Sequence, residues 1–324
     1  MLKIGIIGTN FISDRFCEAA ALVADVKVLA VYSRKAETGE VFAKKHGIKN
    51  VFDSLDALLS SDIDAVYVAS PNFMHKEQSI RALRAGKHVL CEKMMANTAR
   101  DVEEMIAVAR ESGRVLLEAM RPDFDKSFEV VKSALSRLGK VRRSHLEFCQ
   151  YSSRYDKFKA GEMTNAFDPG IANSALADIG IYPLHFAVAL FGEPSEISAS
   201  AVILENGFEG MGVVTMNYTD SLAEIVYSKI TDSKTPSVIE GEHGSLIIDK
   251  ISAPGKLTLL LRDGTEEILD FTPVKNNMVY EIEAFARMTE GKLSPDKYLS
   301  YTLASVRLVN LAHLKNGAEK YLKL

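Results

Sequence analysis

The 324-residue sequence contains no tryptophan and only three cysteines, Cys17, Cys91 and Cys149. Their number is odd and their spacing is wide, without a CxxC pair, which is unlike the disulfide framework of a secreted protein. We therefore expect a reducing compartment and a cytoplasmic location.

Long apolar runs and blocks of like charge are also missing. No stretch approaches the roughly 18 apolar residues that span a bilayer, and the N-terminus shows no signal peptide. The 39 Lys and Arg residues against 43 Asp and Glu give a net charge of −4, spread along the chain. No repeat of the kind that builds a solenoid or a propeller is visible. We expect neither a membrane nor a nucleic acid as the main partner.

The composition is typical of globular proteins, with 47% hydrophobic and 25% charged residues. At about 150 residues per domain, the length corresponds to two domains. Residues 1–120 alternate β-branched runs with segments of helical period, a pattern typical of parallel strands joined by crossover helices. The expected strands are Leu2–Ile7, Val26–Tyr32, Asp64–Ala69, Lys87–Cys91 and Val115–Glu118, and the expected helices are Phe11–Ala24, Ala36–His46, Asn72–Arg84 and Thr98–Glu111. We expect a doubly wound α/β domain of the Rossmann type.

The pattern changes after residue 120. Two helical stretches, near 123–138 and 173–191, surround a strand at 141–150 and a polar loop. Residues 196–271 then alternate apolar and polar side chains between turn signals, which favours an antiparallel sheet, and two closing helices follow. Residues 121–324 are therefore expected to form an α+β domain with a large open, mostly antiparallel sheet.

A glycine turn lies between the first expected strand and helix, where a dinucleotide pyrophosphate binds in such domains. The GxGxxG pattern is incomplete, because Asn10 and Ser13 replace its second and third glycines. Asn tolerates a left-handed backbone and Ser is small, so we expect the turn to persist, with an ordinary βα turn as the alternative. The residues expected to contact the coenzyme there are Gly8, Thr9, Asn10, Phe11 and Ile12.

The end of the second expected strand carries no acid. Tyr32-Ser33-Arg34-Lys35 stands where an NAD-binding domain places an Asp or Glu for the ribose hydroxyls. Ser33 and Arg34 can instead bind a 2′-phosphate through a hydroxyl and a guanidinium. We therefore favour NADP(H) over NAD(H), with a solvated basic turn as the alternative.

Two further segments carry a resemblance to a known family. They read VYVASPNFMH over residues 66–75 and AGKHVLCEK over residues 85–93. Together with the turn at Gly8 and the helix containing His185, they resemble the glucose-fructose oxidoreductase, inositol dehydrogenase and rhizopine catabolism family (Gfo/Idh/MocA). The resemblance implies a hydride-transferring enzyme that uses a nicotinamide coenzyme.

The resemblance implies that Lys93 faces both the nicotinamide and the substrate, although the family's Glu-Lys-Pro reads Glu92-Lys93-Met94 here. Because Met94 has an ordinary amide with little tendency to a cis bond, the backbone that aims Lys93 can differ from the family's turn. For Asn72 and His75, a helix N-cap and an exposed first-turn histidine are the alternative interpretations. Further contacts implied by the resemblance are Ser70, Pro71, Asn72, His75 and Glu92 with the coenzyme, and Arg121 with substrate or coenzyme.

Asp178, Tyr182 and His185 are spaced i, i+4, i+7 and so lie on one face of an expected helix. Resemblance to the branch containing dimeric dihydrodiol dehydrogenase implies that Tyr182 is the acid/base, its phenolate favoured by a neighbouring ammonium such as Lys93. Asp178 would orient neighbours or bind a hydroxyl, and His185 would bind substrate or relay a proton. The alternative is a helix packed through its aromatic face. We expect no metal, because Asp178 and His185 alone lack further ligands.

We therefore expect an NAD(P)-dependent oxidoreductase that interconverts a secondary alcohol and its carbonyl on a sugar, polyol or trans-dihydrodiol. The resemblance implies a homodimer or homotetramer formed through the open sheet, and residues 151–169 are expected to help select the substrate. Two alternatives stay open. They are a non-catalytic dinucleotide-binding sensor on the same fold and an NAD-dependent glycosidase.

Overall fold

A computed structural model describes residues 1–322, which fold into two compact units. The first unit comprises Met1–Arg121 and Lys275–Leu303, and the second comprises Pro122–Val274 and residues 304–322. The first unit ends one residue after the expected division at residue 120. It also contains residues 275–303, which the sequence analysis assigned to the second domain. Among the described residues, no helix combines the length and apolar character needed to cross a membrane.

The sheet of the first unit is parallel and has the order β3-β2-β1-β4-β5-β6. Its strands are β1 Leu2–Ile7, β2 Val26–Tyr32, β3 Asn50–Phe52, β4 Ala65–Val68, β5 His88–Glu92 and β6 Leu116–Ala119. The chain order reverses between β1 and β4, and ligands of such sheets bind outside the carboxyl strand ends at that point. The expected Rossmann-type fold is confirmed.

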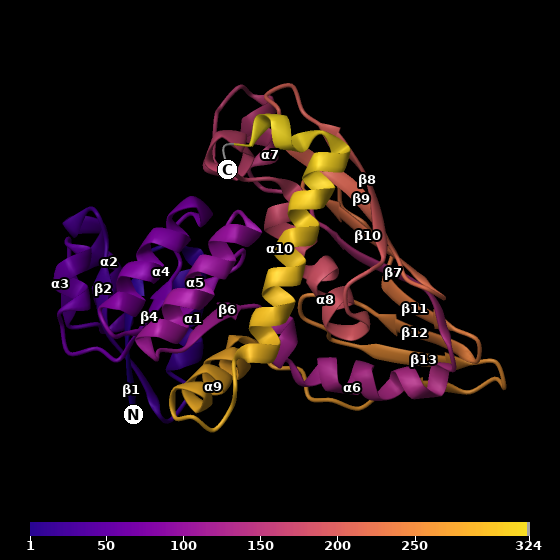
Figure 1. Ribbon diagram of the computed structural model, residues 1–324, viewed down its shortest axis with the longest axis horizontal. Coiled ribbons are helices and arrows are strands. Elements are labelled where there is room, and N and C mark those ends of the chain that lie inside the picture. The colour runs from indigo at the N-terminus through magenta and orange to yellow at the C-terminus, as the bar shows by residue number, and fades with distance from the viewer. Residues whose placement is uncertain (323–324) are drawn as a thin grey trace. The chain divides into compact units, whose positions relative to one another are not determined.

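Helices cover this sheet (Figure 1). They are α1 Phe11–Ala20, α2 Ala36–His46, α3 Leu55–Leu59, α4 His75–Arg84 and α5 Ala99–Ser112, and the unit also contains α9 Met278–Thr289. Helix α9 packs on α1, which brings residues 275–303 into the first unit. The short β3 and α3 were not expected, because three- and five-residue elements are too short to show a period.

The second unit contains an eight-stranded sheet of order β14-β13-β12-β11-β7-β10-β9-β8. Its strands are β7 Val141–Cys149, β8 Glu196–Ile203, β9 Glu209–Asn217, β10 Leu222–Ser228, β11 Ser237–Gly241, β12 Gly244–Ile248, β13 Leu257–Leu261 and β14 Glu266–Ile268. Neighbours are antiparallel except β7 and β10, which are parallel. The expected mostly antiparallel sheet is confirmed.

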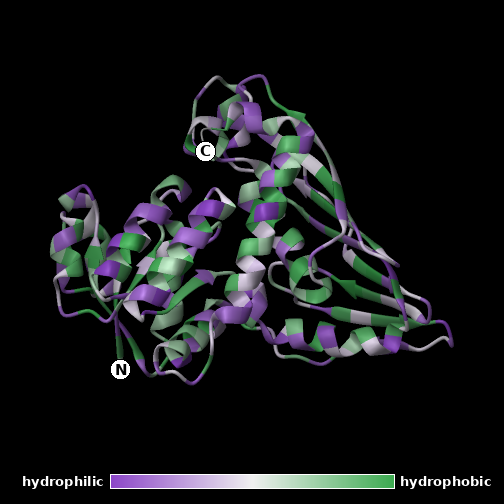
Figure 2. Ribbon diagram, in the orientation of Figure 1, coloured by the Kyte–Doolittle hydropathy of each residue, from purple (hydrophilic) through white to green (hydrophobic). Residues whose placement is uncertain are grey.

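One face of this sheet is covered by helices of the same unit. Helix α6 (Lys126–Ala134) packs on β13, and α8 (Ile181–Phe191) packs on β7 and β10. Nine residues of α8 are buried, and Figure 2 accordingly colours most of this helix as hydrophobic. Leu146, Tyr227 and Ile239 lie on the covered face without exposed surface. A short helix α7 (Tyr155–Lys159) follows β7. Near the end of the described residues, α10 (Asp296–Asn316) is followed by a 3-10 turn, Ala318–Tyr321.

Candidate functional site

The turn after β1 requires glycine at its first position. Gly8 has φ +106°, and a Cβ atom there would lie 2.6 Å from the backbone oxygen of Ala69, which follows β4. Only glycine allows the two strand ends to approach this closely. The backbone at the end of β1 is thus shaped as a dinucleotide-binding turn requires.

Asn10 has another role than its left-handed tolerance, and that part of the sequence interpretation is wrong. Its backbone is extended, with φ −90° and ψ −179°. Its Oδ1 accepts hydrogen bonds from the amides of Ile12 and Ser13, while its Nδ2 donates to Ala69 O over 2.7 Å. Asn10 is therefore the N-cap of α1 and ties the glycine turn to the end of β4. Phe11, the next residue, is 73% exposed at this edge.

The end of β2 presents a hydroxyl and two cations. Ser33 Oγ accepts a hydrogen bond from the amide of Lys35 over 3.4 Å, and the side chains of Arg34 and Lys35 are exposed. Helix α2 begins directly afterwards, and Lys35 at its N-cap position makes no side-chain cap. Cationic side chains beside helix N–H groups fit a phosphate. These residues thus suit the 2′-phosphate of NADP.

The segment after β4 contains Ser70, Pro71 and Asn72, which are half-buried, and His75, which begins α4. His75 has no exposed surface, so it is not the exposed first-turn histidine that the sequence left open. Its Nδ1 lies 2.8 Å from Met94 O and its Nε2 lies 2.8 Å from Ser70 O. Burial lowers the pKa of His75. A direct coenzyme contact of this ring does not fit such an enclosed position.

Lys93 directly follows β5 and is half-buried. The peptide bond between Lys93 and Met94 is cis, contrary to the expectation from an ordinary amide. Glu92 is 7% exposed, accepts a 2.5 Å hydrogen bond from the Tyr67 hydroxyl, and accepts the Lys93 amide through its second oxygen. Burial raises the pKa of Glu92, against the opposing effects of the Tyr67 hydrogen bond and the Lys93 charge. Glu92 is thus enclosed within the protein, which does not fit a direct coenzyme contact.

Arg121 ends the first unit and donates to Asn277 Oδ1 over 3.2 Å. Its positive charge also acts on the buried Glu92 and on Tyr67. Arg121 is therefore part of the charge balance around Glu92, in addition to the ligand contact that the resemblance implies.

In the second unit, Asp178 lies in a π-helical turn, Leu176–Gly180, which directly precedes α8. The sequence pattern had assumed a continuous α-helix, and the one-face argument for Asp178 fails because a π turn closes i to i+5. Asp178 Oδ2 forms a 2.8 Å ion pair with Lys229 Nζ. Pro183 falls in the first turn of α8, where the missing N–H is tolerated.

Lys229 is buried, with 5% of its side chain exposed. Its ammonium also donates to Ala166 O over 2.7 Å and lies 5.1 Å and 5.2 Å from the ring centres of Phe167 and Phe208. Sequence reasoning missed this residue, because a lysine directly after a strand is ordinarily a solvated surface charge. Lys229 holds the Asp178 carboxylate in place.

Tyr182 and His185 lie on α8 and have different partners. The ring of Tyr182 packs against Phe148 of β7 at 5.7 Å between centroids. His185 has no exposed surface, and its Nε2 is 2.8 Å from Asp123 Oδ2 while its Nδ1 is 3.1 Å from Ser305 Oγ. The expected substrate contact of His185 does not fit this enclosure. Asp123 was not anticipated from the sequence.

A buried carboxylate, that of Glu209 on β9, contacts the start of the helical segment that carries Asp178, Tyr182 and His185. Glu209 Oε2 accepts the amide of Leu176 over 3.2 Å and lies 3.3 Å from His313 Nε2. Its Oε1 accepts from Tyr227 and Asn316, each over 2.7 Å. Burial opposes ionisation, but His313 and the other donors prevail and the pKa of Glu209 lies below its ordinary value. A fixed negative charge thus meets the N-terminal end of the π turn, where it is favourable.

The loop expected to select substrate contains an aromatic cluster. Tyr155 lies 5.5 Å from Tyr151 and 5.4 Å from Phe167, and Phe158 lies 5.5 Å from Phe167. Asp168 caps the amide of Gly170. Because Phe167 also contacts the Lys229 ammonium, the loop is connected to the Asp178 ion pair. In residues 1–322, no group of three metal-binding side chains is found.

These features define a protein with a dinucleotide-binding Rossmann domain and a second, α+β unit. The model for the "oxidoreductase family, NAD-binding Rossmann fold" matches residues 2–120, and that for the "GFO/IDH/MocA C-terminal domain" matches residues 130–247. The chain belongs to the Gfo/Idh/MocA family, as the sequence motifs indicated.

Relatives and solved structures support this assignment. The chain is 42% identical to a scyllo-inositol 2-dehydrogenase (NADP(+)) of Bacillus subtilis, over 98% of each chain. It is 29% identical to the trans-1,2-dihydrobenzene-1,2-diol dehydrogenase of Mus musculus, over 80% of this chain and 78% of the relative. A 3-ketoreductase from Actinomadura kijaniata, solved with NADP and TDP-benzene, has a TM-score of 0.87 at 24% identity, over 97% and 98% of the two chains. That likeness shows the fold.

Proposed function

We propose that this protein is an NADP-dependent dehydrogenase or reductase that interconverts a secondary alcohol and its carbonyl on a polyol or sugar. The similarity along the whole chain to an NADP(+)-dependent scyllo-inositol dehydrogenase is the observation that carries this proposal. The similarity to dihydrodiol dehydrogenases fits the same chemistry on a vicinal diol.

The coenzyme preference rests on the end of β2. Arg34 and Lys35 supply positive charge, Ser33 supplies a hydroxyl, and no acid stands among residues 32–35. Gly8 allows the close approach of backbone that a pyrophosphate needs, at the N-terminus of α1. When bound, the nicotinamide accepts or supplies the hydride.

The chain's own residues would manage the proton and the orientation of the substrate. In our proposal, the Lys93 ammonium hydrogen-bonds the reacting oxygen and stabilises negative charge on it. Tyr182 takes the hydroxyl proton in oxidation and returns it in reduction. Asp178, whose Oδ2 forms the ion pair with Lys229, accepts a hydrogen bond from a substrate hydroxyl.

Two alternatives predict other results with the same protein. A non-catalytic sensor would bind the coenzyme without turnover. A glycosidase would release free sugar without net consumption of coenzyme. The named relatives are dehydrogenases, which favours the oxidoreductase.

The coenzyme proposal is tested by titrating NADPH and NADH into the protein and following nicotinamide fluorescence. We expect tighter binding of NADPH, and we expect Arg34→Ala to weaken it about tenfold while NADH binding changes little, because only NADPH carries the 2′-phosphate. Val41→Ala, an exposed change on α2 that leaves the charge intact, is the control. Equal affinities that ignore Arg34 would refute the NADP preference.

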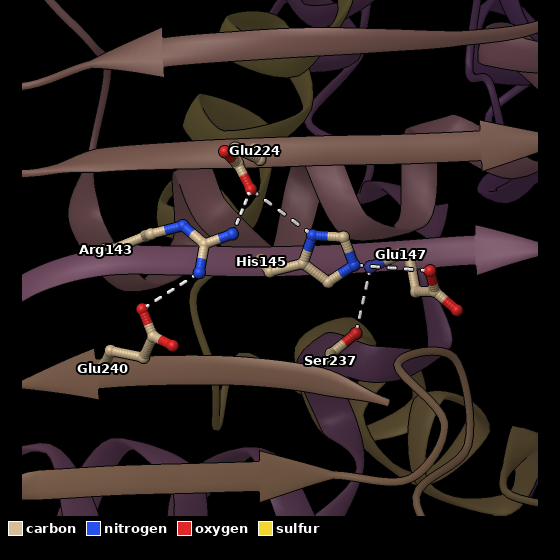
Figure 3. A network of polar contacts seen from close by, with 6 residues as sticks. All are labelled: Arg143, His145, Glu147, Glu224, Ser237 and Glu240. Carbon is tan, nitrogen blue, oxygen red and sulfur yellow. Dashed lines mark hydrogen bonds and ion pairs between the residues drawn. The ribbon is translucent and has the colours of Figure 1, made fainter. Parts of the chain in front are cut away.

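We also propose that the protein forms a homo-oligomer through the uncovered face of its eight-stranded sheet. Val202 and Val213 are 48% and 38% exposed on this face. Between them and β11 runs a polar network: Arg143 contacts Glu224 and Glu240, and His145 contacts Glu224 and Glu147 (Figure 3). Charged side chains that pair with one another, beside exposed valines such as Val202 and Val213, suit a subunit interface.

Sedimentation equilibrium tests the oligomer. We expect a dimer or tetramer, and we expect Val202→Lys with Val213→Lys to shift it toward monomer, since buried unpaired lysines oppose association. A monomeric wild type would refute the proposal. The cytoplasmic location stays a prediction of the cysteine content.

A further inference from the structure

The two sequence neighbours of Lys93 are each bound by a buried side chain from another element of the first unit. Glu92 precedes Lys93 and is bound by Tyr67 of β4. Met94 follows Lys93, and its carbonyl lies 2.8 Å from the His75 ring of α4. Neither Tyr67 nor His75 has exposed surface.

Tyr67 is itself fixed from a third element. Its ring is stacked on Phe16 of α1, with 3.8 Å between centroids and 10° between planes. Its hydroxyl donates to Glu92 Oε1 over 2.5 Å, and Glu92 Oε2 accepts the Lys93 amide over 3.3 Å. A continuous path of contacts therefore leads from the helix of the glycine turn to the backbone of Lys93.

His75 makes the corresponding connection on the other side. Its two nitrogens reach Met94 O and Ser70 O, which places the ring between the segment after β5 and the segment after β4. Met95, the residue after Met94, is held as well, because its amide donates to the buried Glu118 Oε1 over 2.7 Å. Thr302 donates to the second oxygen of Glu118 over 2.8 Å.

We propose that Tyr67 and His75 are positioning residues that fix Lys93 through the residue on each side of it. The inference rests on the proposed role of Lys93 in the reaction, and it assigns His75 a backbone partner in place of the coenzyme contact. A lysine side chain has four rotatable bonds, and motion of its backbone would add further positions for the ammonium. Fixing the backbone at Lys93 removes these added positions.

Two measurements on the 324-residue protein test this proposal independently. The first is hydrogen–deuterium exchange at the amides of Lys93–Ala96, which needs no turnover. The second is the split between kcat and KM for NADP+. The variants are Tyr67→Phe, which removes only a hydroxyl, and the pair His75→Asn and His75→Gln, whose amide nitrogens approximate Nδ1 and Nε2 respectively.

We expect Tyr67→Phe and His75→Gln to speed exchange at 93–96 at least about tenfold, while amides of β1 keep their wild-type rates. We expect kcat to fall about tenfold with KM for NADP+ within about threefold of wild type. His75→Asn keeps the donor toward Met94 and should retain most of both properties. Tyr227→Phe, which removes an equivalent buried hydroxyl–glutamate bond in the second unit, should leave exchange at 93–96 unchanged.

Unchanged exchange at 93–96 in Tyr67→Phe and His75→Gln would overturn the proposal, as would acceleration over all of β1, β4 and β5, which marks general destabilisation. Slow exchange at 93–96 in His75→Gln together with fast exchange in His75→Asn would also overturn the proposal, because it would show the opposite of the expected order of the two variants. If the wild type fails to turn over any polyol, the function falls, and the exchange result still decides whether these residues hold Lys93.

Discussion

Each unit contains a buried tyrosine whose hydroxyl binds a buried glutamate beside a candidate site residue. In the first unit, Tyr67 binds Glu92, the neighbour of Lys93. In the second, Tyr227 binds Glu209, which accepts the amide of Leu176 at the start of the turn carrying Asp178. Both tyrosines lack exposed surface, and burial raises the pKa of each.

The two glutamates differ in charge balance. Glu209 lies 3.3 Å from His313, and its pKa is below the ordinary value despite burial. The pKa of Glu92 is raised by burial, and Lys93 and Arg121 offset this only in part. The comparison teaches that the same tyrosine–glutamate pair can hold a carboxylate whose charge its partners favour, at a helix end, or a carboxyl group whose ionisation burial opposes, beside a functional cation.

The largest expected effect is on turnover and concerns Lys93, which lies beside the Tyr67–Glu92 pair of the first unit. We expect Lys93→Ala to reduce turnover about a thousandfold, because it removes the cation proposed to stabilise the reacting oxygen. Coenzyme affinity should change much less. Steady-state kinetics with NADP+ and a polyol measure both quantities.

Lys87→Ala is the matched control for Lys93→Ala. Lys87 precedes β5, and its ammonium bonds to Ser61 O and Ile63 O at the opposite end of the strand. Near wild-type turnover in Lys93→Ala, or an equal loss in both variants, would contradict the special role of Lys93.

The next effect separates the two glutamates by stability. Glu209→Gln replaces one buried carboxylate oxygen by an amide nitrogen, which cannot accept the Leu176, Tyr227 and Asn316 donors that meet Glu209, and we expect a loss of about 3 kcal/mol at pH 7. Glu92→Gln keeps an acceptor for Tyr67 and removes a charge that burial disfavours, so we expect a change within about 1 kcal/mol. Thermal or urea unfolding at pH 7 measures both. Equal losses would erase the distinction between the pairs.

The pH dependence of the same variants has opposite signs. The lowered pKa of Glu209 means that its contribution is present above its ordinary range and is lost as pH falls through the folded pKa. The deficit of Glu209→Gln should therefore shrink in acid. The raised pKa of Glu92 means that its ionisation costs stability as pH rises through the folded pKa, so Glu92→Gln should gain relative to wild type. Tm values from about pH 2 to 8 decide the signs, because the Glu209 effect falls below the ordinary carboxyl pKa and the Glu92 effect falls above it.

A smaller effect is expected at Lys229, which serves Asp178. Lys229→Met keeps most of the stem against Phe167 and Phe208 and removes the ion pair. If Asp178 binds a substrate hydroxyl, KM for the polyol should rise about tenfold with a smaller change in KM for NADP+. Lys140→Met, which removes an exposed cation paired with Asp220 just before β7, is the control. A selective rise in KM for the coenzyme would contradict the assignment.

The sequence allowed most of the fold to be anticipated, because its strong signals are local. β-branched runs marked β1 and β2 at their observed bounds. The π turn at Leu176–Gly180 was missed since it shares its composition with an α-helix and depends on tertiary contacts such as that from Glu209 to Leu176.

The candidate site was predictable only where chemistry coincides with a strand end or a motif. Lys93 and Gly8 lie at such positions. Lys229, Asp123 and Tyr67 acquire their partners across 51, 62 and 25 positions of the chain, which no local pattern reveals. The enclosure of His75 and His185 also depends on elements distant in sequence.

The central claim is tested most directly by following the absorbance of reduced coenzyme when the wild type is mixed with NADP+ and a panel of inositols and aldoses, beside Tyr182→Phe, which keeps the ring that packs on Phe148. We predict NADP+ reduction with at least one polyol and a loss of about a hundredfold or more in Tyr182→Phe. Tight NADPH binding without turnover of any polyol, or full turnover in Tyr182→Phe, would contradict the account.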